Sequence, residues 1–285
     1  MTVEIREARA DDAGECGRIC YEAFHAIATA HNFPPDLPSP EVGMAIVGSL
    51  VARPGIYGVV AVEDGVVIGS NFLDERNAVS GVGPITVDPA VQNRGAGARL
   101  MQAVMDRSAA KGFAGIRLVQ AGYHTRSLSL YSKLGFDVRE HLSCMQGPAI
   151  NRATEGYAVR PATEADLGAC NTLCTNNHGF ARAGELRDAV AQGGASVVER
   201  DGRITGYTTQ IAFFGHAVTE TNDDLQALIA AAPAFLGPGF LVPSRNGALM
   251  RWCLGKGLRV TQSMTLMTVG LYSEPTGAWL PSVSY

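Results

Sequence analysis

The chain has 285 residues, 46% of them hydrophobic and 18% charged, a balance that predicts a folded globular protein with room for two average domains. The formal net charge of −4 argues against a basic surface for nucleic acid or an anionic membrane. No apolar run approaches the roughly 18 residues that a membrane span needs, and the polar, acidic start MTVEIREARADD is unlike a signal peptide.

The first predicted elements lie in residues 5–20, IREARADDAGECGRIC, which indicate a short strand, an acidic helix start and an amphipathic helix. The same pattern returns without gaps at residues 159–174, VRPATEADLGACNTLC, with six identities in sixteen positions. This agreement exceeds coincidence, so we infer an internal repeat. The identical residues are Arg6, Ala8, Asp12, Gly14, Cys16 and Cys20, which recur as Arg160, Ala162, Asp166, Gly168, Cys170 and Cys174.

Further along the chain, an Asp-Gly turn joins two apolar stretches at residues 62–69, VEDGVVIG, and predicts a β-hairpin. ERDGRITG at residues 199–206 has the same pattern in the second copy. Residues 127–138, SLSLYSKLGFDV, predict a helix that ends at a C-cap glycine before a strand, and LMRWCLGKGLRV at 249–260 repeats it. These matching segments occur in the same order in both halves, as expected for a duplicated unit.

We therefore predict two copies of one domain, residues 1–150 and 151–285, joined near GPAINRATEG at 147–156. Each copy combines hairpins with helix-length segments. This pattern favours the α/β (α+β) class, with a mixed sheet flanked by helices.

The six cysteines, without an export signal, favour free thiols in a reducing cytoplasm. Cys16 and Cys20 lie one helical turn apart, as do Cys170 and Cys174 in the second copy. Because the pairs fall at equivalent sites of two domains, each is expected to pack its own core. No metal site is predicted.

The most informative segment is VGPITVDPAVQNRGAG at residues 82–97, a buried-strand pattern that runs into a glycine-rich turn before a helix at 98–105. Such a helix start leaves backbone N–H groups free and adds the positive end of the helix dipole, which suits a phosphate or pyrophosphate. The second copy has ETNDDLQALIAAAPAF here, without glycines, and Asp223 and Asp224 would repel a pyrophosphate. We expect no second catalytic centre there.

Residues 87–97, VDPAVQNRGAG, resemble the acetyl-CoA motif of the GCN5-related N-acetyltransferase (GNAT) superfamily, Gln/Arg-x-x-Gly-x-Gly/Ala, after a Val-x-Pro strand end. Residues 130–136, LYSKLGF, resemble the family's second block, in the right order and at the right spacing. The resemblance covers about residues 3–145 at motif level and 157–270 in outline. It implies two tandem GNAT-like acyl-CoA N-acyltransferase domains, the second degenerate.

The resemblance implies acetyl-CoA as cosubstrate. The strand ending at Val87 would splay from its neighbour and pair with the pantetheine arm, while the N–H of Val87 would stabilise the oxyanion. The turn amides would hold the pyrophosphate, and Arg94 would reach a phosphate or remain a solvated charge. The residues implied in cofactor binding are Ile85, Val87, Gln92, Asn93, Arg94, Gly95, Ala96, Gly97, Ala98, His124 and Tyr131.

Tyr131 is implied as the general acid that protonates the departing thiolate. From spacing alone, it would instead be an aromatic on a core-facing stripe with Leu128 and Leu134. His124 stands eleven residues before Gly135, where the family usually has Asn, and an imidazole can make one of the expected hydrogen bonds to pantetheine.

The general base is less clearly marked, because VGPITV lacks the Glu that many family members carry on the fourth strand. The nearest acids are Asp74 and Glu75, and Glu75 is the candidate base. A charged turn beside Arg76 and deprotonation through water are the alternatives.

In this fold, residues 24–43, FHAIATAHNFPPDLPSPEVG, would line the acceptor side and offer His25, His31, Phe33 and Asp36. The mostly apolar wall argues against a polyamine. The terminal segment, residues 274–285, carries Trp279 and is expected to pack across the domain interface or toward the active cleft.

We therefore predict an N-acetyltransferase that moves acetyl from acetyl-CoA to a primary amine of a small molecule or peptide by direct attack, at a single active site in the N-terminal domain. A non-catalytic acyl-CoA sensor or scaffold is the alternative, and a propionyl or succinyl donor is a third interpretation. Nucleic acid and membrane partners are not expected. The oligomeric state stays open, with a homodimer as one option.

Overall fold

The computed structural model describes residues 3–284. Its first half contains strands and helices in the order β1 (Glu4–Glu7), α1 (Ala13–Ala30), α2 (Pro40–Ala52), β2 (Ile56–Glu63), β3 (Val66–Asp74), β4 (Ser80–Val82), β5 (Thr86–Val87), α3 (Ala96–Ala110), β6 (Gly115–Ala121), α4 (Thr125–Lys133) and β7 (Asp137–Gln146). The second half continues with β8 (Ala158–Pro161), α5 (Leu167–His178), α6 (Ala183–Ala191), β9 (Ser196–Arg200), β10 (Arg203–Thr208), β11 (Ala217–Thr219), α7 (Asn222–Ala231), β12 (Phe240–Pro243), α8 (Gly247–Gly255), β13 (Arg259–Gly270) and β14 (Ala278–Leu280).

The repeated residues make the same contacts at the start of each half. Arg6 pairs with Asp12 at 2.7 Å, and Arg160 pairs with Asp166 at 2.8 Å. Each carboxylate also accepts a backbone N–H three residues upstream, so that it closes the turn before the first helix. The identities in the sequence repeat therefore preserve one local structure, a strand tied to the following helix start.

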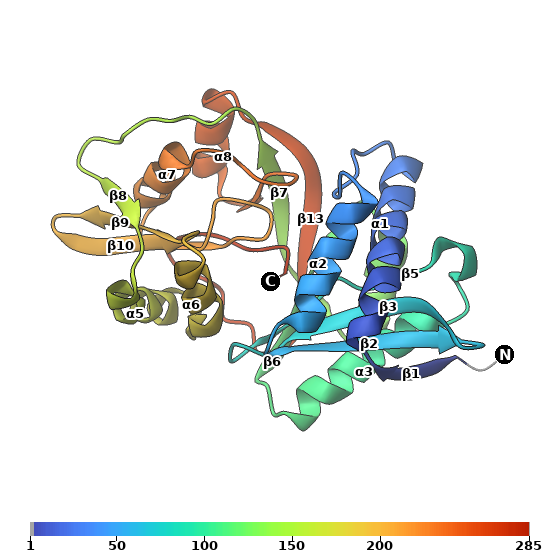
Figure 1. Cartoon of the computed structure of the whole chain (residues 1–285). Helices are drawn as coiled ribbons and strands as arrows, with labels where there is room; N and C mark the ends of the chain where they lie inside the picture. The colour runs from blue at the N-terminus through green and yellow to red at the C-terminus, as the bar shows by residue number, and fades with distance from the viewer. Residues whose placement is uncertain (1–2, 285) are drawn as a thin grey trace.

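The two halves share a sheet rather than folding side by side. In the nine-stranded sheet the order is β1-β2-β3-β4-β6-β13-β7-β12, with β5 attached to β3. The long strand β13 of the second half therefore lies between β6 and β7 of the first. Conversely, β7 lies between β13 and β12 of the second half. These two long antiparallel strands run through the middle of the molecule (Figure 1).

This exchange gives each half a strand from the other, so the sheet crosses the division proposed after residue 150. A separate five-stranded sheet, β14-β11-β10-β9-β8, completes the second half. Helices cover both sheets, in agreement with the predicted mixed sheet flanked by helices.

Buried side chains fill the layers between sheets and helices. Cys16 and Cys20 pack against α2 and the β2–β3 hairpin, whereas Cys170 and Cys174 pack in a cluster of the second half. All six cysteines are buried free thiols. Within residues 3–284 no helix has the length and apolar character that crossing a membrane demands, and no grouping of three or more metal-ligating side chains occurs.

Candidate active site

The central feature of the site is a strand that leaves its neighbour halfway. β4 pairs in parallel with β6 through Ser80 and Gly81. After Val82 the chain turns away, and β5 pairs only with β3, with Val87 opposite Gly69. A gap therefore opens between β5 and β6. The resemblance of residues 87–97 to the acetyl-CoA motif implied that the strand ending at Val87 would splay in this way.

The hydrogen-bond pattern of β5 shows which of its backbone groups face this gap. Asp88 donates its N–H to the carbonyl of Ile68 at 2.9 Å, so these two residues form a hydrogen-bonded pair. In an antiparallel ladder the next pair, Val87 and Gly69, is then a non-hydrogen-bonded one. The N–H of Val87 therefore points away from β3, toward the gap.

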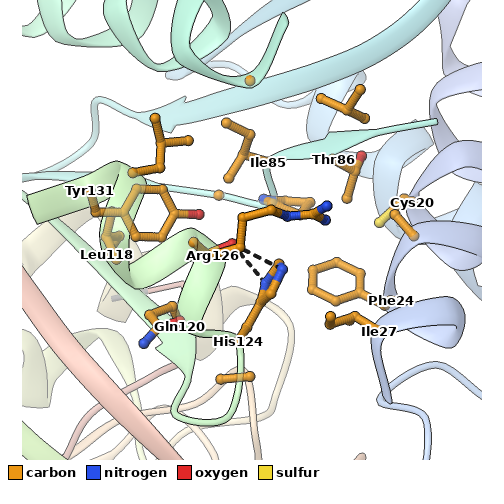
Figure 2. Close-up of a pocket in the computed structure, with 18 of the residues that line it drawn as sticks. Cys20, Phe24, Ile27, Ile85, Thr86, Leu118, Gln120, His124, Arg126 and Tyr131 are labelled. Carbon is orange, nitrogen blue, oxygen red and sulfur yellow. Dashed lines mark hydrogen bonds between the residues drawn. The ribbon is translucent and has the colours of Figure 1, made fainter. Parts of the chain in front are cut away.

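A cavity of about 920 Å³ occupies the gap and widens toward α1. Its walls come from α1, the β4–β5 segment, the turn before α3, β6 and α4 (Figure 2). Phe24 and Ile27 of α1 lie across from His124 and Tyr131 in the close-up. The second half completes the wall with Phe213, Phe214, Met264, Val283 and Ser284.

The glycine-rich turn ends at the start of α3, where Gly95 is the N-cap residue with φ 89°, a conformation that favours glycine. Helical bonding begins with the N–H of Arg99, which donates to the carbonyl of Gly95 at 3.2 Å. The amides of Ala96, Gly97 and Ala98 precede that bond and line the cavity. An added Cβ at Gly97 would make ordinary van der Waals contacts of 3.8 Å with Leu130 and Val87, so no atom crowds this position of the helix start.

Arg126 of α4 braces the turn and is a site residue that the sequence did not single out. Its guanidinium donates to Gln92 Oε1 at 2.6 Å and to Asn93 Oδ1 at 3.2 Å. Gln92 in turn donates its amide to the carbonyl of Val87 at 2.9 Å. The turn is thus tied both to the splayed strand and to α4, and a positive charge lies beside the helix start.

Tyr131 lies on α4, and its position agrees with both interpretations, a core aromatic ring and a hydroxyl that faces the site. Its ring belongs to the core cluster around α3 and contacts Phe136 at a centroid distance of 6.2 Å. Its hydroxyl points into the cavity (Figure 2). Burial raises the pKa of Tyr131 to about 12, while a hydrogen bond with Ser127 acts in the opposite direction. The hydroxyl is therefore protonated at neutral pH.

His124 precedes α4 as its N-cap residue and also lines the cavity. Burial, followed by the nearby charges of Arg126 and His31, lowers the pKa of His124 to about 4, so its imidazole is neutral at pH 7. Ser127 Oγ lies 2.7 Å from its Nδ1.

Most of the residues named from the sequence for cofactor binding and catalysis gather in this cavity, and two of them, Arg94 and Glu75, do not. Arg94 is 57% exposed and lies 3.6 Å from Glu63 of the β2–β3 hairpin. Glu75 pairs with Arg107 of α3 at 2.6 Å, outside the residues that line the cavity. The residues brought together are Ile85, Val87, Gln92, Asn93, Gly95, Ala96, Gly97, Ala98, His124 and Tyr131. Of the acceptor-side candidates, His31 and Asp36 line the cavity, whereas His25 and Phe33 do not.

Gln120 of β6 is a second residue that the sequence analysis missed. It lines the cavity, is 6% exposed, and neither atom of its amide has a hydrogen-bond partner within residues 3–284. A buried amide without partners is costly, so a ligand that supplies them would be favoured. The available signal was a polar residue two positions after Leu118 in a strand that also carries Arg117.

The equivalent place in the second half is filled by the chain itself. β14 pairs with β11, with Trp279 opposite Val218, and lies beside β12. It therefore occupies the position that the gap between β5 and β6 has in the first half. The start of α7 is closed as well, because Thr221 and Asp224 cap each other's backbone N–H groups at 3.0 and 3.2 Å.

Residues 24–136 match the family model of the acetyltransferase (GNAT) family. The first half of the chain is therefore similar to this family over residues 24–136. Solved structures with the same overall fold include a candidate acetyltransferase from Pyrococcus horikoshii, 18% identical, with 96% of this chain and 91% of that chain covered and a TM-score of 0.74. A GCN5-related N-acetyltransferase from Sphaerobacter thermophilus is 17% identical, with coverage of 96% and 97% and a TM-score of 0.61.

A tandem GNAT protein from the clavulanic acid biosynthesis pathway is 14% identical to this chain, with coverage of 94% and 98% and a TM-score of 0.57. At such identities the three structures show the fold alone, and they show it for both halves of this chain. No curated protein sequence matches the chain.

Proposed function

We propose that this protein is an N-acetyltransferase that moves acetyl from acetyl-CoA to the primary amine of a small molecule or peptide, with one active centre in its first half. The observation that carries the proposal is the shared cavity. A splayed strand, an open helix start and a protonated tyrosine all face it.

The cavity has suitable partners for each part of acetyl-CoA. The amides of Ala96 to Ala98 and the guanidinium of Arg126 suit the pyrophosphate, because both present positive potential to a phosphate. The free edge of β5 and the unpartnered amide of Gln120 suit the peptide-like groups of the pantetheine arm. Arg94 is paired with Glu63 and exposed, so we assign it at most a peripheral part.

The same arrangement supports direct attack by an amine on the thioester. The N–H of Val87 would stabilise the oxyanion of the tetrahedral intermediate. Tyr131 would protonate the departing sulfur, and its raised pKa keeps that proton available throughout the neutral range. Glu75 is held by Arg107 away from the cavity, so we assign it no part in the reaction.

The assignment of one active centre rests on β14. This strand and Trp279 fill the slot of the second half, and the first turn of α7 carries the carboxylates of Asp223 and Asp224, which would repel a phosphate. The six buried free thiols favour a reducing, cytoplasmic setting.

The test is release of free CoA thiol from acetyl-CoA across primary amines, amino acids and short peptides, together with the stoichiometry of CoA binding. We expect thiol release with a subset of acceptors and one bound CoA per chain. Tight CoA binding with no acceptor-dependent thiol release would favour the sensor or scaffold function. Propionyl-CoA and succinyl-CoA in the same assay identify the preferred acyl group.

A further inference from the structure

Within residues 3–284, one carboxylate side chain lines the cavity, and its setting is unusual. Asp36 lies in the loop between α1 and α2 and lines the cavity. Its Oδ1 accepts a hydrogen bond of 2.8 Å from Nε2 of Gln262, which is 3% exposed on β13 of the second half. Among residues 3–284 no cation forms an ion pair with Asp36. It is therefore a carboxylate at the cavity wall with one neutral hydrogen-bond donor.

The surroundings of Asp36 are mainly apolar, with Ile27, Leu37, Phe213 and Met264 in the same wall. A carboxylate in such a place is poorly solvated, and burial accordingly raises the pKa of Asp36 despite the hydrogen bond from Gln262. An unpaired, half-buried anion beside apolar side chains would be stabilised by a ligand that brings a positive charge on an apolar body.

We propose that Asp36 binds the ammonium group of the acceptor and takes its proton before attack, that Gln262 positions this carboxylate, and that the acceptor is an apolar monoamine without a carboxylate beside its amine. This inference rests on the proposed function and names its substrate class. An acidic group next to the amine would face Asp36 as a like charge. Lysine-like or polyamine acceptors would place a second cation in an apolar wall.

Every proton in this step has a donor and an acceptor. The ammonium gives one proton to Asp36 and becomes a free amine, whose lone pair forms the C–N bond while the carbonyl electrons move to oxygen. When the C–S bond breaks, sulfur keeps the electron pair and takes the proton of Tyr131. The second proton lost by nitrogen restores Tyr131, and Asp36 returns its proton to water. The products are an amide, CoA thiol and one proton.

The ionisable groups that interact with the charge of Asp36 have pKa values well above neutral pH, so we expect Asp36 to be the group whose protonation changes when the acceptor binds. Tyr123, from the turn after β6, and Cys144, on β7, both interact with its charge, and burial raises their pKa values to about 12 and about 11. Gln262 is neutral. His31, on the same loop, contacts the ring of Tyr123 at a centroid distance of 5.4 Å and needs a control of its own.

The first experiment measures binding by calorimetry on the full chain, without and with CoA, using 2-phenylethylamine, its uncharged isostere 2-phenylethanol, and phenylalanine. We expect the amine to bind about tenfold or more tightly than either comparison compound, since a charge-assisted hydrogen bond is worth that factor. Asp36→Asn, which keeps the contact with Gln262, should abolish the preference. Glu41→Gln, an exposed neighbour on α2, should keep it.

Equal binding of amine and alcohol by the wild type, or an undiminished preference in Asp36→Asn, would overturn the inference. Both outcomes are independent of catalysis and of CoA, so they are distinguishable from failure of the proposed function, which appears as absent CoA binding or thiol release. The midpoint of thermal unfolding reports whether Asp36→Asn is folded.

The second experiment tests the positioning role of Gln262 through pH. Its hydrogen bond favours the charged carboxylate, so Gln262→Met should raise the pH at which 2-phenylethylamine binding is half lost on acidification. His31→Asn should leave that midpoint in place. A midpoint that follows His31→Asn, or that ignores both Asp36→Asn and Gln262→Met, would rule out Asp36 as the group that binds the amine.

Discussion

Gln262 Nε2 lies 2.8 Å from Asp36 Oδ1, although 226 positions separate the two residues in the chain. The contact exists because β13 is inserted between β6 and β7, which brings the second half to the acceptor end of a cavity formed mostly by the first half. The second half thus contributes to the wall of this cavity, although β14 lies at the corresponding place in its own half.

Replacing Tyr131 with Phe removes the proposed acid while keeping the ring in the core. We expect kcat to fall by about 10²-fold or more, the usual contribution of a general acid, with little change in the dissociation constant of CoA. Because burial raises the pKa of Tyr131 to about 12, the wild-type kcat should show no loss attributable to this group up to pH 10. Steady-state rates of thiol release across pH measure the fall in kcat and the pH dependence of kcat. Full activity in Tyr131→Phe would refute the assignment.

Gly97→Glu should abolish CoA binding, because its side chain would place a negative charge in front of the helix start. The position tolerates a Cβ, which would meet Leu130 and Val87 only at 3.8 Å, so the backbone need not move. Gly14→Glu is the matched control in the first turn of α1, where an added Cβ meets nothing within 4 Å. Calorimetry with CoA reads out both variants. Stoichiometric binding that persists in Gly97→Glu would point to a site in the second half.

The local elements and the cavity wall around the start of α3 were predictable because they are encoded in contiguous residues. The turn before α3 and the block around Tyr131 place their groups within one or two turns of helix. The repeat likewise predicted paired structures, as in the ion pairs of Arg6 and Arg160. The fold and the similarity to the family followed from these motifs.

The acceptor end was not predictable because it depends on contacts between distant segments. No local pattern says that Gln262 meets Asp36, or that Phe213 and Val283 reach the same cavity. Periodicity assigns β13 to a strand but does not choose its neighbours, so the exchange with β7 was invisible. Arg126 was missed for the same reason, since it matters through Gln92 and Asn93, which lie more than thirty positions away in the chain.

The shared sheet predicts that the two halves unfold together. Leu266 of β13 is fully buried between β6 and β7, so Leu266→Ala should lower the free energy of unfolding by about 2–5 kcal/mol. Val138→Ala, at a position of β7 that is 43% exposed, should change it by less than about 0.5 kcal/mol. Scanning calorimetry should record one transition that shifts as a whole. Two separable transitions, of which only one moves, would contradict a common cooperative unit.

The repeated ion pair predicts how the free energy of unfolding depends on pH in the acidic range. The Arg6 guanidinium lowers the pKa of Asp12, so the stability that this carboxylate contributes is present above the ordinary Asp value of about 4 and is lost as the pH falls through the lowered one. Asp12→Asn should therefore cost about 1–2 kcal/mol at pH 7 and progressively less toward pH 2. Denaturant unfolding at several pH values measures the difference. Asp64→Asn, in the exposed hairpin turn, controls for loss of a charge. A cost for Asp12→Asn that stays constant from pH 7 to pH 2 would mean that the carboxylate acts through its shape rather than its charge.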